Sequence, residues 1–190
     1  MRELSLHILD LVENSLRARA RNIEIEIAED SSEDRLMIRV SDDGRGMDGE
    51  MLKRATDPFF TTRKTRQVGL GLPLLKAAAE RCDGRFWVAS EPNVRTTVRA
   101  EFQRDHIDRA PLGNMPDTLL AIILYHGDKD LAYTHRVDDQ VFAFDTADLR
   151  EVLGGIALTE PRVRAWLQGF ITEGVEGLRQ RPTAHSEHVD

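Results

Sequence analysis

Apolar positions recur along the first hundred residues with two different periods. Residues 3–19 place leucine, isoleucine and valine three and four positions apart, which predicts an amphipathic helix. Residues 22–29 and 35–42 alternate apolar with charged positions, which predicts two half-buried strands joined by an acidic, serine-rich hairpin loop. The other elements expected in this half are a short helix over 48–56, an irregular loop over 57–67, a helix over 73–82 with Pro73 in its first turn, and strands over 84–91 and 96–102.

The second half of the chain has its own pattern of elements. It predicts a helix over 117–126, a hairpin of residues 131–137 and 140–146 turning at Asp138-Asp139, and a short capped helix over 146–155. A long helix over 159–179 is expected to be capped by Thr159. Its predicted apolar face consists of Val163, Trp166, Leu167, Phe170 and Ile171.

These elements group into two units. The division expected is an N-terminal domain over 1–104, a Pro- and Gly-containing linker over 105–116, a C-terminal α/β unit of unknown role over 117–181, and a disordered tail over 182–190. The helix at 160–180 and the hairpin are expected to dock on the N-terminal domain or on a partner.

Composition narrows the class of protein. Of 190 residues, 41% are hydrophobic and 31% charged, the balance of a globular protein. A single cysteine, Cys82, excludes an internal disulfide and a cysteine metal cage. No apolar run approaches a membrane span, and the N-terminus lacks the features of a signal peptide, so a cytoplasmic location is expected. The net charge of −7 disfavours nucleic acid as a partner.

The first helix carries a polar face opposite its leucine stripe. His7, Asp10, Asn14 and Arg17 share that face at about 100° per residue. An asparagine and a carboxylate one turn apart suit a divalent ion and a general base directed at one water. Glu13 is adjacent to Asn14 in sequence, but it points about 100° away from this polar face around the helix. The alternative is an ordinary solvated face.

Three further stretches carry candidate chemistry. In "VSDDGRGMD", Asp43, Gly44 and Gly46 offer an acceptor carboxylate and a backbone that a flat ligand can approach closely, although a tight turn has the same composition. "DPFFTTRK" contains Phe59 and Phe60, which ordinary loop anchoring would also explain. Finally, "QVGLGLPLLK" opens a helix with two glycines, and the free N–H groups of a helix start favour an anion.

The order of these stretches is more specific than any one of them. An asparagine on the first helix, an Asp-Gly turn after a strand, Phe-Phe, and Gly-x-Gly leading into a helix resemble the Bergerat ATP-binding fold. That superfamily includes gyrase, heat-shock-90 chaperones, MutL and sensor histidine kinases. Residues 57–102 look especially like the ATP-binding domain of a histidine kinase. The resemblance implies an α+β fold, a two-layer sandwich of a mixed sheet covered by helices, with a small C-terminal α+β unit added.

The resemblance also implies roles for individual residues. Asn14 resembles the magnesium-binding asparagine, Asp10 and Glu13 are the candidate catalytic acids, and Asp43 matches the acid that accepts from the adenine amino group. Arg63 and Lys64 lie in the position of the ATP lid, with Arg66, although a solvated flexible loop is the alternative. The remaining implied ATP-binding residues are Gly44, Gly46, Phe59, Phe60, Thr62, Gly69, Leu70, Gly71, Leu72 and Thr96.

The chain departs from the family pattern at three positions. Asp10 stands where MutL-like members have a glutamate, and aspartate is one methylene shorter, so hydrolysis is expected to be slow or water-bridged. Gln67 replaces the usual glycine that begins the glycine-rich stretch, and Arg95 replaces the glycine before Thr96.

The function implied is that of a Mg-ATP-binding, histidine-kinase-like ATPase or phosphotransferase acting in signalling through a separate partner protein. An anti-sigma-type protein serine kinase and a non-catalytic ATP-gated switch are the alternatives, and whether ATP is turned over stays open. A protein partner or a homodimer is expected, without a membrane. "HIDRAPL" offers His106 as a phosphoacceptor, against the alternative of a structured linker.

Overall fold

The computed structural model describes residues 3–57 and 71–180. The helices and strands follow the expected order with boundaries shifted by a few residues. The helices are α1 (Leu4–Arg17), α2 (Gly49–Arg54), α3 (Gly71–Arg81), α4 (Met115–Tyr125), α5 (Thr146–Val152) and α6 (Pro161–Gln180). The strands are β1 (Asn22–Asp30), β2 (Arg35–Asp42), β3 (Arg85–Glu91), β4 (Arg95–Gln103), β5 (Asp130–Val137) and β6 (Gln140–Asp145).

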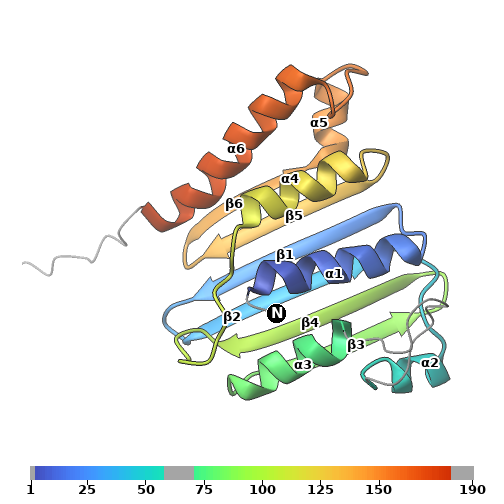
Figure 1. Cartoon of the computed structure of the whole chain (residues 1–190), viewed down its shortest axis with the longest axis vertical. Coiled ribbons are helices and arrows are strands. Elements are labelled where there is room, and N and C mark those ends of the chain that lie inside the picture. The colour runs from blue at the N-terminus through green and yellow to red at the C-terminus, as the bar shows by residue number, and fades with distance from the viewer. Residues whose placement is uncertain (1–2, 58–70, 181–190) are drawn as a thin grey trace, which may run out of the picture.

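The strands form one sheet in the order β3-β4-β2-β1-β5-β6. Every neighbouring pair is antiparallel except β1 with β5, so the sheet is mixed. Helices α1, α3, α4 and α6 lie over one face of this sheet (Figure 1). The architecture is therefore an α+β two-layer sandwich, as the sequence predicted.

The alternation in β1 and β2 explains which face of the sheet the helices cover. Ile23, Ile25 and Ile27 are almost completely buried, and the residues between them are not. On the opposite face, Glu26 pairs with Arg39 at 2.7 Å, and Glu24 pairs with Arg95 at 3.2 Å. The period of two thus places isoleucine under the helices and charged pairs toward solvent.

The C-terminal unit continues the sheet of the N-terminal half. Strand β5 runs parallel to β1, with Ile25 opposite Tyr133, and the hairpin partner β6 lies beyond it. Docking of the hairpin on the N-terminal half is confirmed. A single apolar core joins residues of both halves, from Leu4 in α1 to Ile171 in α6. Residues 105–116 remain a connection in sequence, but they join two parts of one sheet.

That connection also completes the start of α1. The N–H group of Leu4 donates to the carbonyl of Pro111 at 2.9 Å, and that of Ser5 donates to Leu112 at 2.8 Å. The first N–H groups of a helix lack partners within the helix, so these bonds satisfy them. The start of α1 is therefore fixed by the segment that leads into the C-terminal unit.

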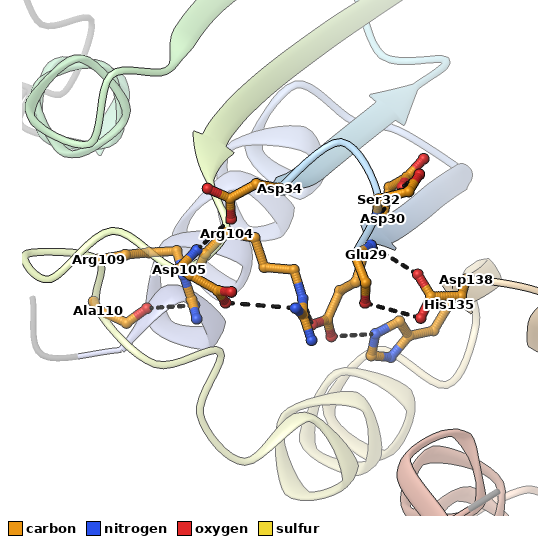
Figure 2. A network of polar contacts seen from close by, with 11 residues as sticks. Glu29, Asp30, Ser32, Asp34, Arg104, Asp105, Arg109, Ala110, His135 and Asp138 are labelled. Carbon is orange, nitrogen blue, oxygen red and sulfur yellow. Dashed lines mark hydrogen bonds and ion pairs between the residues drawn. The ribbon is translucent and has the colours of Figure 1, made fainter. Parts of the chain in front are cut away.

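A polar cluster crosses the boundary between β1 and β5 (Figure 2). The His135 ring is fully buried, with Nε2 3.1 Å from Glu29 and Nδ1 3.1 Å from the Tyr133 hydroxyl. Arg104 approaches Glu29 at 3.6 Å. Burial alone raises the pKa of the Glu29 carboxyl, but the contact with His135 and the charges of Arg179 and Arg104 outweigh it and hold the pKa below its ordinary value.

Helix α6 differs from its sequence-based prediction in two details. The Glu160 side chain accepts from the N–H groups of Arg162 and Val163, at 2.8 and 3.0 Å, so Glu160 caps the helix and the prediction of Thr159 was wrong. Trp166 was predicted on the buried face but is 50% exposed. The helix packs against β5, β6 and α4, and Trp166 lies on the flank of its apolar face that reaches solvent.

Candidate functional site

The polar face of α1 is narrower than the sequence predicted. Asp10 and Asn14 are half-buried and Arg17 is exposed, but only 4% of His7 is accessible. Helices α3 and α4 both contact α1. Burial lowers the pKa of His7 to about 4, and its Nδ1 atom has no hydrogen-bond partner within the described chain. His7 is therefore a neutral, buried group.

Asp10 and Asn14 lie against the first residue of α3. A β carbon built on Gly71 would stand 2.0 Å from the Asp10 Oδ2 atom and 3.5 Å from the Asn14 Nδ2 atom. A methyl group at residue 71 would therefore require the Asp10 side chain to shift from this position. The N-terminus of α3, whose first N–H groups have no partners within the helix, is thus placed directly beside a carboxylate and an amide.

The second candidate acid on α1 points elsewhere. Glu13 pairs with Arg17 at 2.8 Å and lies 3.9 Å from His126 at the end of α4. It therefore faces the C-terminal unit, in agreement with the helical phase. Of the two acids, Asp10 is the one beside the start of α3.

The two adjacent aspartates at the end of β2 have different surroundings. Asp43 accepts from the N–H groups of Arg21 and Asn22, at 2.7 and 2.9 Å, and from the Asn22 side chain at 2.6 Å. Partial burial raises the pKa of the Asp43 carboxyl, but these hydrogen bonds outweigh it and the pKa is lowered. Both oxygens of Asp43 are thus bound to the start of β1.

Asp42 instead faces the helix layer. It is 8% exposed, and the Ser15 hydroxyl of α1 donates to its Oδ2 at 2.7 Å. The Gly44 N–H donates to its Oδ1 at 2.9 Å. Each carboxylate oxygen accepts more than one hydrogen bond, so Asp42 keeps acceptor capacity on the side of the sheet that carries α1.

Gly44 and Gly46 allow the turn after β2 to pack closely. A β carbon on Gly44 would stand 2.8 Å from the β carbon of Ala18 at the end of α1. Gly46 has φ of 65°, and a β carbon there would lie 2.5 Å from the Glu91 carbonyl oxygen. The turn is held between α1 and the β3–β4 connection, and a side chain at either glycine would displace it.

Thr96 lies beside Asp42 on the same face of the sheet. The two residues are directly opposite in the β2–β4 pair, and Ser90 is opposite Thr96 in the β3–β4 pair. The Ser90 and Thr96 hydroxyls are 2.9 Å apart, and the Met47 N–H donates to Ser90 at 2.8 Å. Directly opposite residues of antiparallel strands share a face, so these polar groups form one row under the helix layer.

Of the predicted ATP-binding residues between Phe59 and Leu72, the structure describes only Gly71 and Leu72. Leu72 is half-buried in the first turn of α3 and packs against the core. The remaining members of the predicted ATP-binding set lie outside the described residues. They are Phe59, Phe60, Thr62, Arg63, Lys64, Gly69 and Leu70. Gln67 also lies outside the described residues.

His106 lies at the opposite end of α3 from Gly71. Its Nε2 atom is 3.6 Å from Asp83, which follows the last turn of α3, and its Nδ1 accepts from the Asp108 N–H at 3.1 Å. A helix of 11 residues is about 16 Å long at 1.5 Å per residue. His106 is therefore remote from the cluster of Asp10, Asn14 and Gly71.

Sequence reasoning missed Asp42, Ser15 and Ser90. The spacing itself held the signal for Asp42, because an Asp-x-Gly-x-Gly pattern that ends at Gly44 and Gly46 begins at residue 42. Ser15 and Ser90 gave no such signal, since only the tertiary fold brings them to Asp42 and Thr96.

The described residues offer no protein-only metal site. Within residues 3–57 and 71–180, no three His, Cys, Asp or Glu side chains are grouped so that they could hold a metal ion. A magnesium ion at Asn14 would therefore take its other ligands from water and phosphate, which is the usual mode of Mg²⁺ binding. The amide and carboxylate oxygens of Asn14 and Asp10 fit that ion chemically.

Comparison with known proteins identifies the class. The family described as "Histidine kinase-, DNA gyrase B-, and HSP90-like ATPase" matches residues 2–106, more than half of the chain. The chain therefore belongs to this ATPase family, and the resemblance read from the ordered motifs is confirmed.

Individual relatives are sensor kinases. A "Probable C4-dicarboxylate sensor kinase" of Halalkalibacterium halodurans is 34% identical over 101 residues, which are 50% of this chain and 19% of that protein. "Sensor protein IrlS" of Burkholderia pseudomallei is 33% identical over 98 residues, 49% of this chain and 21% of the relative. The chain thus spans about a fifth of the length of these curated relatives.

A solved structure shares the fold. The crystal structure of the N-terminal domain of a DNA repair protein superposes with a TM-score of 0.50 at 16% identity, covering 75% of this chain and 52% of the other. Separately, none of the helices in the described ranges is both long and apolar enough to span a membrane.

Proposed function

We propose that the chain binds Mg-ATP at the cluster formed by α1, the turn after β2 and the start of α3, and that it acts as a histidine-kinase-like ATPase or phosphotransferase. The observation that carries this proposal is the contact of Gly71 with Asp10 and Asn14. A helix N-terminus attracts phosphate, and a neighbouring amide and carboxylate provide an ion ligand and a proton acceptor.

The acceptor of the adenine amino group is assigned to Asp42 in this proposal, in place of Asp43. Asp42 lies on the helix side of the sheet beside Thr96, whereas the oxygens of Asp43 are already bound to Arg21 and Asn22. The Ser15 hydroxyl holds Asp42 in position. Asp43 then acts as a positioning residue that joins the turn to β1.

The proton acceptor of the reaction is assigned to Asp10. Its carboxylate lies at the start of α3, where a bound triphosphate would place its terminal group, and Glu13 is directed at Arg17 and His126. Asp10 would orient a water or an acceptor hydroxyl and take its proton. Asn14 would hold the magnesium ion, which neutralises phosphate charge when bound.

The phosphoryl acceptor is proposed to be water or a separate protein. His106 is separated from Gly71 by the length of α3, so it is out of reach of the same molecule's phosphate site. An anti-sigma-type serine kinase would have the same ATP site, and the two activities differ only in the group that receives the label.

One observation favours an ATP-gated switch as a second candidate. Helix α1 carries Asp10 and Asn14, and the same helix is capped by Pro111 and Leu112 and contacts α4. A change at the nucleotide site would thus reach the C-terminal unit through one rigid element.

One experiment separates these functions. The pure protein is incubated with γ-labelled ATP and magnesium, and free phosphate and protein-bound label are read together with ATP affinity from calorimetry. Asn14→Ala should abolish the magnesium-dependent part of ATP binding, and Asp10→Asn should preserve binding but stop phosphate release. Tight ATP binding without turnover in the wild type would exclude both enzymatic functions and leave the ATP-gated switch as the remaining candidate. Unchanged affinity in Asn14→Ala would remove the assignment of the site.

A further inference from the structure

One surface of α6, on the side of the helix turned away from its buried residues, has an unusual composition. Arg162, Trp166, Gly169, Glu173 and Glu176 follow one another at spacings of four and three residues, so they form a single stripe along the helix. We call this stripe the outer face of α6. Trp166 is 50% exposed and stacks on Phe170, with ring centroids 5.2 Å apart. A large, half-exposed aromatic side chain within such a stripe is typical of an interface.

The glycine in this stripe has no use within the chain as described. A β carbon on Gly169 would meet no atom within 4 Å, whereas one on Gly174 of the same helix would lie 2.2 Å from the Phe142 ring. Glycine lowers helix stability relative to alanine. Packing inside the chain requires the glycine at 174 but not the one at 169. A glycine on a helix surface does allow another backbone to approach closely.

The neighbouring strand is an edge strand among the described residues. Strand β6 is the last strand of the sheet, and its sequence "QVFAFD" has no lysine, proline or internal charge to discourage pairing with another strand. The Phe170 ring contacts Phe142 and Phe144, with centroids 5.3 and 6.1 Å apart. The middle of α6 therefore lies over the middle of β6, at the end of the molecule that Figure 1 shows in orange and red.

The charges on α6 indicate what covers this surface. Arg162 lies seven residues before Gly169, and Glu176 lies seven residues after it. An antiparallel copy of the same helix, crossing at Gly169, would place each arginine opposite a glutamate of the other copy. A parallel copy would place like charges together, which is unfavourable.

We propose that the outer face of α6 and the edge of β6 form a twofold interface with a second copy of this chain. Gly169 lies on the axis, Arg162 faces the partner's Glu176, and Trp166 is covered by the partner helix. The same axis pairs the two β6 strands antiparallel, with Phe142 opposite the partner's Phe144 and the two copies of Ala143 opposite each other. Both pairings keep the helices of the two copies on one side of a continuous sheet.

Charge reversal tests the proposal without disturbing the core. Arg162 and Glu176 are both exposed, so Arg162→Glu and Glu176→Arg should fold as the wild type does. The oligomeric state of the full chain is measured by sedimentation velocity over a range of concentrations, with and without Mg-ATP. Arg162→Glu should raise the dimer dissociation constant by about tenfold, because two exposed pairs change from attraction to repulsion. Arg162→Glu combined with Glu176→Arg should restore it.

A cysteine on the axis gives an independent geometric test. Gly169→Cys should form a disulfide-linked dimer under mild oxidation, since residue 169 meets its own counterpart. The adjacent Gln168→Cys is the matched control, because it points about 100° away and should stay monomeric on a denaturing gel. The native Cys82 is buried and should not contribute. A wild type that is monomeric under all conditions, a dimer equally stable in the single and double charge variants, or equal cross-linking of both cysteines would overturn the proposal.

Discussion

Gly71 and Asp10 are in contact across two helices, and a side chain at residue 71 would displace the Asp10 carboxylate from its present position. A β carbon at residue 71 would lie 2.0 Å from the Asp10 Oδ2 atom, which is far inside van der Waals contact. The start of α3 and the polar face of α1 therefore hold each other in position.

Gly71→Ala should weaken Mg-ATP binding strongly, because the new methyl group must displace either Asp10 or the first turn of α3. The free energy of unfolding should fall by about 1–3 kcal/mol, as for other overpacked sites. Calorimetry with Mg-ATP and urea denaturation measure the two effects. Gly49→Ala is the matched control, since a β carbon at that helix start meets nothing within 4 Å. Equal ATP affinity in both variants would contradict the assignment of Gly71 to the site.

Changing each of the two aspartates at the end of β2 to asparagine should have different effects on ATP affinity and on stability. Asp42→Asn should lose ATP affinity, because the amide can no longer accept on both atoms where Ser15 and Gly44 donate. Asp43→Asn should keep more of the affinity and instead lose stability by about 1–3 kcal/mol, since it breaks charged hydrogen bonds to Arg21 and Asn22. Calorimetry gives the ATP affinity of each variant, and denaturation gives its free energy of unfolding. The reverse pattern would return the acceptor role to Asp43.

His7 should make the protein sensitive to mild acid. Its pKa is lowered from 6.5 to about 4 by burial, so between these values the unfolded chain binds a proton that the folded chain does not. Stability should therefore be unaffected by His7 above pH 6.5 and should fall as the pH drops toward 4, by about 3 kcal/mol for a shift of this size. The comparison is with His7→Phe, whose stability should decline less over this window. Parallel curves for the two proteins would show that His7 titrates normally.

Glu29 should stabilise the boundary between β1 and β5. Glu29→Gln should lower the free energy of unfolding by about 1–3 kcal/mol at neutral pH, because it weakens contacts with the buried His135 and with Arg104. The pKa of Glu29 is lowered, so its contribution is present above the ordinary glutamate pKa and is lost as the pH falls through the folded-state value. Glu33→Gln, at an exposed surface pair with Arg35, is the control and should change stability little. A similar loss in both variants would mean that Glu29 acts only through surface charge.

The local pattern of the sequence predicted the elements well because period and turn chemistry are local properties. The alternation of Ile23, Ile25 and Ile27 with glutamates predicted β1, and the leucine spacing predicted α1. The pairing of β1 with β5 depends on residues more than a hundred positions apart, so no local signal contains it. The burial of His7 has the same origin, because it arises from the packing of neighbouring helices.

The part of the candidate site that could be predicted consists of residues in motifs that follow one another in a fixed order along the sequence. Asn14, Gly44, Gly46 and Gly71 were found that way, and their roles in binding ATP remain predictions. The proposal of Asp42 in place of Asp43 rests on the structure, in which Asp42 lies beside Thr96 while both oxygens of Asp43 are bound at the start of β1, although the spacing to Gly44 and Gly46 also begins at residue 42. Glu160 was overlooked as a cap because Ser, Thr, Asp and Asn are the usual cap residues.

The parallel contact of β1 with β5 has a consequence for synthesis on the ribosome. The partner of β1 on one side, β2, follows it directly in the chain, but its partner on the other side is complete only when residues 130–137 have been made. Strands that await a distant partner fold slowly and expose a pairing edge meanwhile. The acidic Glu24 and Glu26 on the outward side of β1 give the nascent strand a charged surface during that delay. Slowing translation within the last third of the message should therefore lengthen the time in which this edge of β1 lacks its partner strand.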